Sequence, residues 1–325
     1  MKFGVLQFFS WPERRVPLIE VYRRALERVD IMDHGGYDTV WLAEHHFSTY
    51  SVCPSVHLMG MHIADRTENI RIGTGVSLAA FYHPLRLAEE VALLDNLSGG
   101  RVNWGAGRGF DRKEMENFHV PIEESYERFR ENVEIVLQAW EVGALNYRGK
   151  FNTFEDVEVL PKPLQDPMPV WMATSTENAI GWAAEQGHAI LMDPHSTNED
   201  LGKKRAFYTQ TMQAHGHQEI RDIPMARLIA VAETDAKAEA VARAGAEWTV
   251  GGYASGKRGG PPSPVSQEER VETYVNDVII HGSPEKVIDE LQALEETIGL
   301  DYLLASILSH ETFIRLTDDV LPKFN

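Results

Sequence analysis

Two hydrophobic patterns alternate along this chain. Short apolar runs of six to nine residues predict β-strands, and longer stretches with apolar residues three or four positions apart predict amphipathic helices. The strands are expected at 2–8, 39–44, 70–78, 101–107, 168–174, 188–193, 225–233 and 301–307. The helices are expected at 16–36, 55–67, 83–100, 122–143, 177–187, 199–216, 235–250 and 283–299.

This order predicts an α/β fold in a single domain over residues 1–325. About eight strands separated by helices are typical of βαβ units with parallel strands. Such units close into a (β/α)8 TIM barrel or leave an open doubly wound sheet, and periodicity does not separate the two outcomes. The strand count and the uniform composition favour the closed barrel, in which functional residues gather where the strands end.

Two segments depart from the alternation. Residues 144–167 form a polar excursion that predicts a short hairpin or loop. Residues 251–270 are so rich in glycine and proline that no helix or strand is expected there. A long loop of this kind is typical either of disorder or of a functional lid, and a mobile lid would be both.

The composition is ordinary for a soluble globular protein, and a cytoplasmic location is expected. A formal net charge of −18, from 49 acidic and 31 basic residues, disfavours binding to nucleic acid and to anionic membranes. No apolar run is long enough to predict a membrane span, and the first residues lack the pattern of a signal peptide. The single cysteine, Cys53, excludes an internal disulfide and fits a reducing compartment.

The segment "WLAEHHFSTY" at 41–50 places Glu44, His45 and His46 directly after a buried run. The pair of histidines could simply begin a polar loop. Adjacent side chains on an extended chain point to opposite sides, and no HxH or HExxH spacing occurs, so no metal site is expected. A catalytic imidazole at the end of a strand is the stronger functional reading, because it titrates near neutral pH.

Three further strand ends carry glycines or hydroxyls. "GAGRGF" at 105–110 has GxGxG rather than GxGxxG spacing, and a polar segment rather than an immediate helix is predicted after it. Its glycines, like those of "GTGVS" at 73–77, permit either a bend or the close approach of a flat ligand. Arg108 could then reach an anionic group. In "ATSTEN" at 173–178, the hydroxyls suit helix capping and phosphate binding equally.

Taken together, these motifs resemble the bacterial luciferase-like flavin monooxygenase family. The likeness to the luciferase α subunit is strongest from 36 to 110, in "GYDTVWLAEHHF", "RIGTGVSLAAFYHPLRLAEEVALLDNLSGGR" and "WGAGRGF". "VWMATSTENAIGWAAEQG" and "SPEKVIDELQ" resemble the family further along. The combination is specific, although each piece alone is weak.

The resemblance implies a (β/α)8 barrel with a mobile loop where residues 251–270 lie. It also implies a two-component monooxygenase, in which a separate NAD(P)H:flavin reductase supplies reduced FMN. In that chemistry the flavin reacts with O2 to form a C4a-hydroperoxide, which oxygenates a small organic substrate. The family tends to form dimers, so a homodimer is expected.

The resemblance also implies roles for particular residues. His45 matches the family's essential histidine, expected to stabilise the flavin peroxide and move a proton, with Glu44 and His46 holding it. Gly75–Val76 match a non-proline cis peptide against which the flavin ring packs. Arg108 matches a phosphate-binding arginine, and Tyr126 stands where luciferase has another. The further cofactor contacts are expected at Gly107, Thr174, Ser175 and Thr176.

Departures from luciferase argue against light emission. Gly107 replaces a reactive cysteine, Ser175 replaces an acidic residue and Ala179 replaces a threonine. Two other functions share the resemblance: a deazaflavin-dependent oxidoreductase that transfers hydride, and a non-catalytic flavin-binding protein. The presence of His45 and of a lid argues against simple storage. An NAD dehydrogenase would rest on the GxGxG spacing alone.

Overall fold

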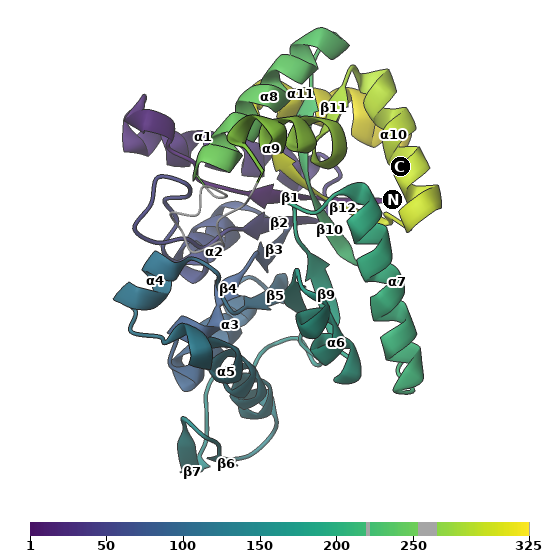
Figure 1. Cartoon of the computed structure of the whole chain (residues 1–325). Coiled ribbons are helices and arrows are strands. Elements are labelled where there is room, and N and C mark those ends of the chain that lie inside the picture. The colour runs from purple at the N-terminus through teal and green to yellow at the C-terminus, as the bar shows by residue number, and fades with distance from the viewer. Residues whose placement is uncertain (219–221, 253–264, 325) are drawn as a thin grey trace. The chain divides into compact units, whose positions relative to one another are not determined.

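Strands and helices alternate in the computed structural model, which describes residues 1–218, 222–252 and 265–324 (Figure 1). The strands are β1 (Lys2–Gln7), β2 (Thr39–Leu42), β3 (Arg71–Thr74), β4 (Ser77–Leu78), β5 (Val102–Gly107), β6 (Leu145–Arg148), β7 (Thr153–Val157), β8 (Val170–Thr174), β9 (Ala189–Met192), β10 (Pro224–Val231), β11 (Ile280–Gly282) and β12 (Tyr302–Ile307). The α-helices are α1 (Leu18–His34), α2 (Val56–Arg66), α3 (Pro84–Leu97), α4 (Arg112–Asn117), α5 (Ser125–Trp140), α6 (Glu177–Glu185), α7 (Asn198–Ala214), α8 (Asp235–Gly252), α9 (Gln267–Thr273), α10 (Pro284–Ile298) and α11 (His310–Arg315).

The strand pairing closes a parallel (β/α)8 barrel. The order is β11-β10-β12-β1-β2-β3-β5-β8-β9, and β9 also pairs with β10 where Met192 meets Met225. The short β4 follows β3 along the same partner, β5, and β11 is added to β10. The predicted TIM barrel is confirmed, and each of the eight predicted strands lies in it.

Two compact units make up the chain. The first consists of Met1–Gln7, Ile31–Val40 and Met172–Asn325, and the second of Phe8–Asp30 and Trp41–Trp171. In the second unit, the fully buried indole of Trp41 and the backbone at Thr74 explain two glycines. A Cβ atom on Gly73 would lie 2.4 Å from Trp41, and one on Gly105 would lie 2.1 Å from the Thr74 carbonyl oxygen. These glycines therefore make room for the protein itself rather than for a flat ligand.

The core of the first unit includes a helix with small residues on one face. Ala238, Ala242 and Ala246 of α8 are fully buried at a spacing of four, so they share a face. Two of these alanines cluster with apolar side chains of β10 and α9, among them Leu228 and Val271. Because alanine is small, α8 can approach the strand closely.

Two predictions about irregular segments can be compared with the structure. The excursion at 144–167 contains the antiparallel β6–β7 pair, which lies beyond α5 in Figure 1, so the predicted hairpin is confirmed. The expectation of no element in 251–270 is wrong at both ends. Gly252 ends α8, and α9 begins at Gln267 after a capping box in which Ser266 and Glu269 bond each other's backbone amides. The remaining residues of the predicted lid, 253–264, lie outside the described residues.

A further correction concerns the residues after β5. The polar segment that follows "GAGRGF" was expected to hold no immediate helix, but it contains the helix α4. Asp111 caps it by accepting a hydrogen bond from the Lys113 amide at 2.9 Å. An acidic cap followed three residues later by Glu114 is a helix-start signal that was available in the sequence.

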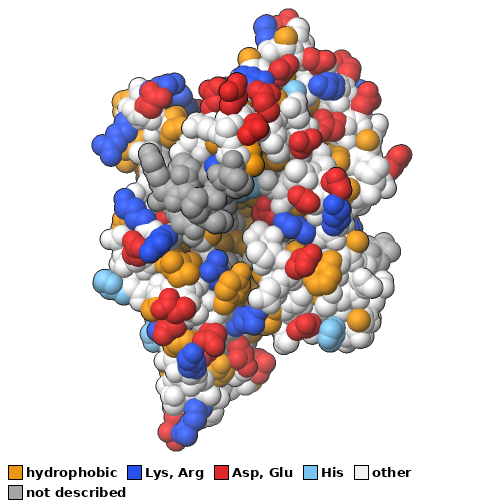
Figure 2. All heavy atoms as spheres, in the orientation of Figure 1, with side chains coloured by type: hydrophobic (Ala, Val, Ile, Leu, Met, Phe, Trp, Pro, Cys, Tyr) orange, Lys and Arg blue, Asp and Glu red, His pale blue; other side chains and the backbone are white. Residues whose placement is uncertain are grey.

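The surface carries mixed charge. On the face drawn in Figure 2, acidic and basic side chains are interspersed. Among the helices of the described residues, none combines the length and apolar character needed to cross a membrane.

Candidate active site

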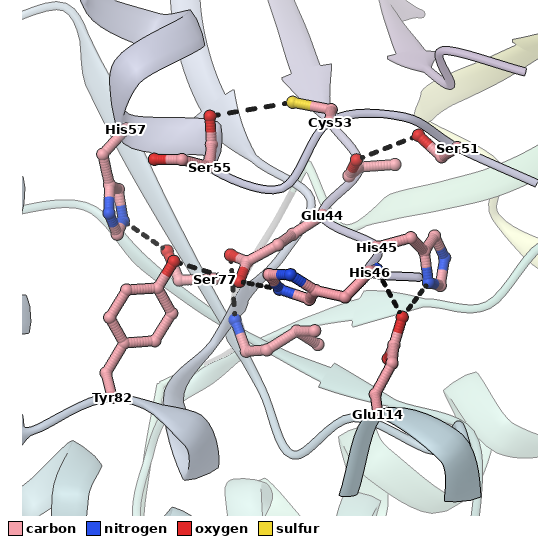
Figure 3. A network of polar contacts seen from close by, with 12 residues as sticks. Glu44, His45, His46, Ser51, Cys53, Ser55, His57, Ser77, Tyr82 and Glu114 are labelled. Atoms are coloured by element: carbon pink, nitrogen blue, oxygen red, sulfur yellow. Dashed lines mark hydrogen bonds and ion pairs between the residues drawn. The ribbon is translucent and has the colours of Figure 1, made fainter. Parts of the chain in front are cut away.

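The segment Glu44–His45–His46 follows β2 in the second unit and is almost entirely buried. Glu44 exposes 2% of its surface and His45 7%. The two imidazoles turn to different carboxylates, which lie on opposite sides of the pair in Figure 3. This is the alternation expected of adjacent residues on an extended chain.

Glu114 of α4 holds His45. Its Oε1 atom lies 3.1 Å from His45 Nδ1 and accepts the His46 backbone amide at 2.7 Å. A carboxylate at Nδ1 favours the tautomer with the proton on Nδ1, which leaves Nε2 as the acceptor. No described residue forms a hydrogen bond with Nε2. His45 is therefore held at one nitrogen and open at the other.

Aromatic rings surround His45. Phe8 is stacked on it at a centroid distance of 6.2 Å, and Tyr50 and Phe110 meet it edge-on at 5.1 and 5.7 Å. Apolar walls around an imidazole lower the local dielectric and strengthen its interaction with Glu114. The ring is consequently fixed in orientation by packing as well as by the carboxylate.

Glu44 holds His46, not His45. Its Oε1 atom lies 3.0 Å from His46 Nε2 and accepts the Tyr82 hydroxyl at 3.0 Å, while Oε2 lies 3.4 Å from the Leu78 amide. Burial, and then Glu44, raise the pKa of Tyr82, so this hydroxyl remains a donor. Glu44 and His46 were expected to hold His45, and that expectation is wrong. Glu44 bonds His46, and the residue that holds His45 is Glu114.

A second buried histidine supports β4. His57 of α2 lies 2.9 Å from the Ser77 hydroxyl through Nε2 and 3.0 Å from Glu90 through Nδ1. The hydrogen bond to His57 lowers the pKa of Glu90, against the effect of burial, and Arg86 adds to the lowering. The side chain of Ser77 and the amide of Leu78 are thus both anchored.

The structure also tests the geometry predicted at Gly75–Val76. The peptide between these residues is cis, as the sequence resemblance implied. Their expected contact with a flavin stays a prediction. Gly107, the last residue of β5, is buried and pairs with Leu78.

Arg108 contacts two residues at the start of α5. Its guanidinium lies over the Tyr126 ring at 4.2 Å, and Nη1 donates to the Ser125 hydroxyl at 3.0 Å. Among the described residues, no acidic side chain pairs with Arg108. Tyr126 was expected to contact phosphate through its hydroxyl, but the contact seen here is between its ring and Arg108.

The hydroxyls predicted to bind phosphate after β8 belong to the first unit. Thr176 caps α6 by accepting from the Ala179 amide at 3.3 Å, which confirms the capping interpretation. Ser175 is exposed. Thr174 is buried, and its Oγ1 atom has no hydrogen-bond partner in the part of the chain that the structure describes. A buried hydroxyl without a partner is suited to a bound polar group.

The end of β9, also in the first unit, carries a cluster that sequence reasoning missed. Asp193 accepts the Ser196 amide at 2.9 Å and lies 3.1 Å from Lys204 Nζ. Arg227 is fully buried and donates to the Ser196 carbonyl at 2.6 Å. Burial lowers the pKa of Arg227 to about 10, although Asp193 opposes the shift.

No group of three or more His, Cys, Asp or Glu side chains among the described residues is placed to hold a metal ion.

Comparisons with known proteins identify the family of this chain. A family model described as luciferase-like monooxygenase matches residues 1–301. The oxygenase component of flavin-dependent trigonelline monooxygenase from Acinetobacter baylyi is 28% identical over 94% of this chain and 91% of that protein. An uncharacterized protein of Sinorhizobium fredii, y4vJ, is 31% identical over 67% of this chain, and the match spans 63% of that protein's length.

Solved structures share the fold. The monooxygenase RslO1 from Streptomyces bottropensis superposes with a TM-score of 0.88 at 26% identity, and each chain is covered completely. Flavin-dependent and coenzyme F420-dependent enzymes under 25% identical also share it.

Proposed function

We propose that this chain, which belongs to the luciferase-like monooxygenase family, uses reduced FMN and O2 to oxygenate a small organic substrate. A separate flavin reductase would supply the reduced FMN, and a cytoplasmic homodimer is the expected form. The observation that carries the proposal is the His45 ring, bound by Glu114 at Nδ1 and open at Nε2.

His45 is the proposed catalytic residue. Reduced FMN, when bound, supplies the electrons that activate O2. Because Glu114 fixes the Nδ1–H tautomer, Nε2 can accept a proton from a bound molecule and return it. Phe8 and Phe110 pack against the imidazole and hold its orientation. Glu114 acts as a positioning residue, since it touches the imidazole rather than the reacting molecules.

Arg108 is the proposed phosphate ligand of FMN. Its guanidinium is oriented by Tyr126 and Ser125 and has no carboxylate partner among the described residues. Arg108→Ala is expected to weaken FMN binding about 10-fold to 100-fold while changing riboflavin binding by less than about threefold. Equal loss for both flavins would refute the phosphate role. Gly75, Val76, Gly107, Tyr126, Thr174, Ser175 and Thr176 remain proposed cofactor contacts.

The proposed function is tested by anaerobic titration of the protein with reduced FMN, followed by mixing with O2. Flavin absorbance and O2 consumption are recorded. If the proposal is correct, bound flavin reoxidises on a time course distinct from that of free reduced FMN. Reoxidation at the rate of free flavin would favour a flavin-binding protein instead.

A hydride-transfer enzyme is the second candidate, because coenzyme F420-dependent enzymes share the fold. The same titration with reduced F420 separates the two. Tight binding of F420, with no binding of FMN and no O2 consumption, would replace the monooxygenase proposal.

A further inference from the structure

Three phenylalanines form an exposed cluster beside the two histidines. Phe47 follows the EHH segment, Phe81 precedes α3, and Phe118 ends α4. The ring of Phe118 lies 5.4 Å from that of Phe47 and 5.1 Å from that of Phe81, and it meets His46 edge-on at 4.7 Å. These four rings, all in the second unit, come from three separate segments of the chain.

The cluster is open to solvent although its members are large and apolar. Phe47 exposes 52% of its surface and Phe118 36%. Phe47 also has a φ of 54°, a left-handed conformation that bulky residues adopt only rarely. A glycine or asparagine would suit this turn better and would expose less apolar surface. An exposed aromatic group in an unfavourable backbone conformation points to a role outside the fold itself.

The cluster is connected to the proposed catalytic residue through α4. Glu114, which holds His45, and Phe118, which covers His46, lie four residues apart and therefore on one face of the helix. A molecule bound against Phe118 would lie beside the histidine pair. This continuity points to a small molecule of the same reaction rather than to an unrelated partner.

The basic side chain of Lys113 lies at the edge of the cluster. Lys113 Nζ donates to the Phe47 carbonyl at 3.3 Å. The neighbouring Arg112 pairs with Glu116, whereas no acidic side chain among the described residues pairs with Lys113. In a chain with a net charge of −18, a basic group without a carboxylate partner beside aromatic rings suits an anionic ligand.

We propose that Phe47, Phe81, Phe118 and Lys113 form a substrate subsite for a planar aromatic acid. The rings take the flat face and edges of the substrate, and Lys113 takes its carboxylate. The ring planes of Phe47 and Phe118 are inclined by 38°, so a flat ring can stack on one and meet the other at its edge. This inference rests on the proposed function and specifies its substrate class.

Binding of 1-naphthoate and decanoate to the isolated protein tests the subsite by titration calorimetry, without flavin or O2. Naphthoate is expected to bind about threefold to tenfold more tightly than decanoate. Both ligands gain from burial of apolar surface and from the charge of Lys113, but only naphthoate can stack on the rings. Phe118→Leu should weaken naphthoate binding by a similar factor. The control Phe207→Leu, at another exposed phenylalanine, should not change it.

Three results would overturn the proposal. Equal binding of decanoate would indicate a general apolar surface. Loss of naphthoate binding in the presence of saturating FMN would assign the rings to the flavin site. If Lys113→Gln weakens the binding of neutral 1-naphthylmethanol as much as the binding of naphthoate, the charge of Lys113 has no role in the subsite. Since none of these measurements involves turnover, their failure is distinct from failure of the monooxygenase proposal.

Discussion

The ends of β2 and β9 have similar sequences and different structures. "WLAEHH" and "ILMDPH" each place an acidic residue and a histidine after a buried apolar run. After β9, Asp193 is satisfied by its own loop, accepting the His195 and Ser196 amides at 3.0 and 2.9 Å. After β2, the carboxylate that holds His45 comes from Glu114, 69 residues away.

The two loops differ in what their polar side chains bind. The loop after β9 is held together by its own polar groups, whereas the loop after β2 leaves an imidazole nitrogen available for chemistry. Asp193 uses its oxygens to hold backbone amides and Lys204, and His195 lies 3.2 Å from the Tyr274 hydroxyl. His45 is oriented from a distance, and its Nε2 atom has no protein partner among the described residues. A locally satisfied carboxylate stabilises a loop, whereas a distant one can orient a reactive group.

The largest expected effect comes from exchanging the two histidines for alanine. His45→Ala should lower the oxygenation rate by about 10²-fold to 10⁴-fold, because a positioned proton-transfer group is lost. His195→Ala should change the rate by less than about threefold if its role is structural. The yield and rate of oxygenated product in a single turnover of bound reduced FMN measure both. Comparable losses in the two variants would break the distinction between the two strand ends.

Much of the fold could be predicted because each strand and helix is specified by its own residues. Buried runs such as 225–233 and amphipathic stretches such as 283–299 carry their periodicity locally, and β10 and α10 formed there. The short helices were harder. With six residues, α4 has fewer than two turns of periodicity, so only its cap at Asp111 could reveal it.

The site was predicted less completely. The cis peptide at Gly75–Val76 was predicted from sequence resemblance and is present. The catalytic role of His45, predicted in the same way, stays a proposal. Glu114 was missed because its role depends on a tertiary contact that no sequence period records. For the same reason Glu44 was assigned to the adjacent His45, although side-chain alternation directs it elsewhere.

The next largest effect is expected from replacing Glu114, the carboxylate that orients His45. Glu114→Gln should lower the oxygenation rate by about 10-fold to 100-fold, because the amide no longer favours the Nδ1–H tautomer as a carboxylate does. Flavin binding should remain unchanged. Glu116→Gln is the matched control, since Glu116 is on the same helix and its carboxylate pairs with the exposed Arg112. A normal rate in Glu114→Gln would show that His45 needs no carboxylate.

After β9, the Asp193 carboxylate should affect the free energy of unfolding rather than the reaction rate. Burial opposes ionisation of Asp193, but Lys204, His195 and Ser196 outweigh it, so its pKa lies below the usual value. Asp193 therefore stabilises the fold above its unfolded pKa of about 3.9, and this contribution is lost as the pH falls through the folded pKa. Asp193→Asn should reduce the free energy of unfolding by about 1–3 kcal/mol at neutral pH.

Denaturant titrations at pH 7, 5 and 3 measure this prediction. The difference between the wild-type protein and Asp193→Asn should be constant from pH 7 to pH 5 and smaller at pH 3, because protonation removes the wild-type advantage. The oxygenation rate of the folded variant should be unchanged within about twofold. A rate loss without a stability loss would move Asp193 from the structural group to the reactive one.

The smallest effect distinguishes the two histidines of the EHH segment. His46 bonds the buried Glu44, and Phe118 covers its ring. His46→Gln retains a donor for Glu44 and should change the oxygenation rate by less than about fivefold. His46→Leu removes that donor and should lower the free energy of unfolding by about 1–3 kcal/mol, since a buried carboxylate loses a hydrogen bond. Rescue by glutamine of the stability that leucine loses would identify His46 as support for Glu44, whereas a rate loss as large as that of His45→Ala would make both histidines reactive.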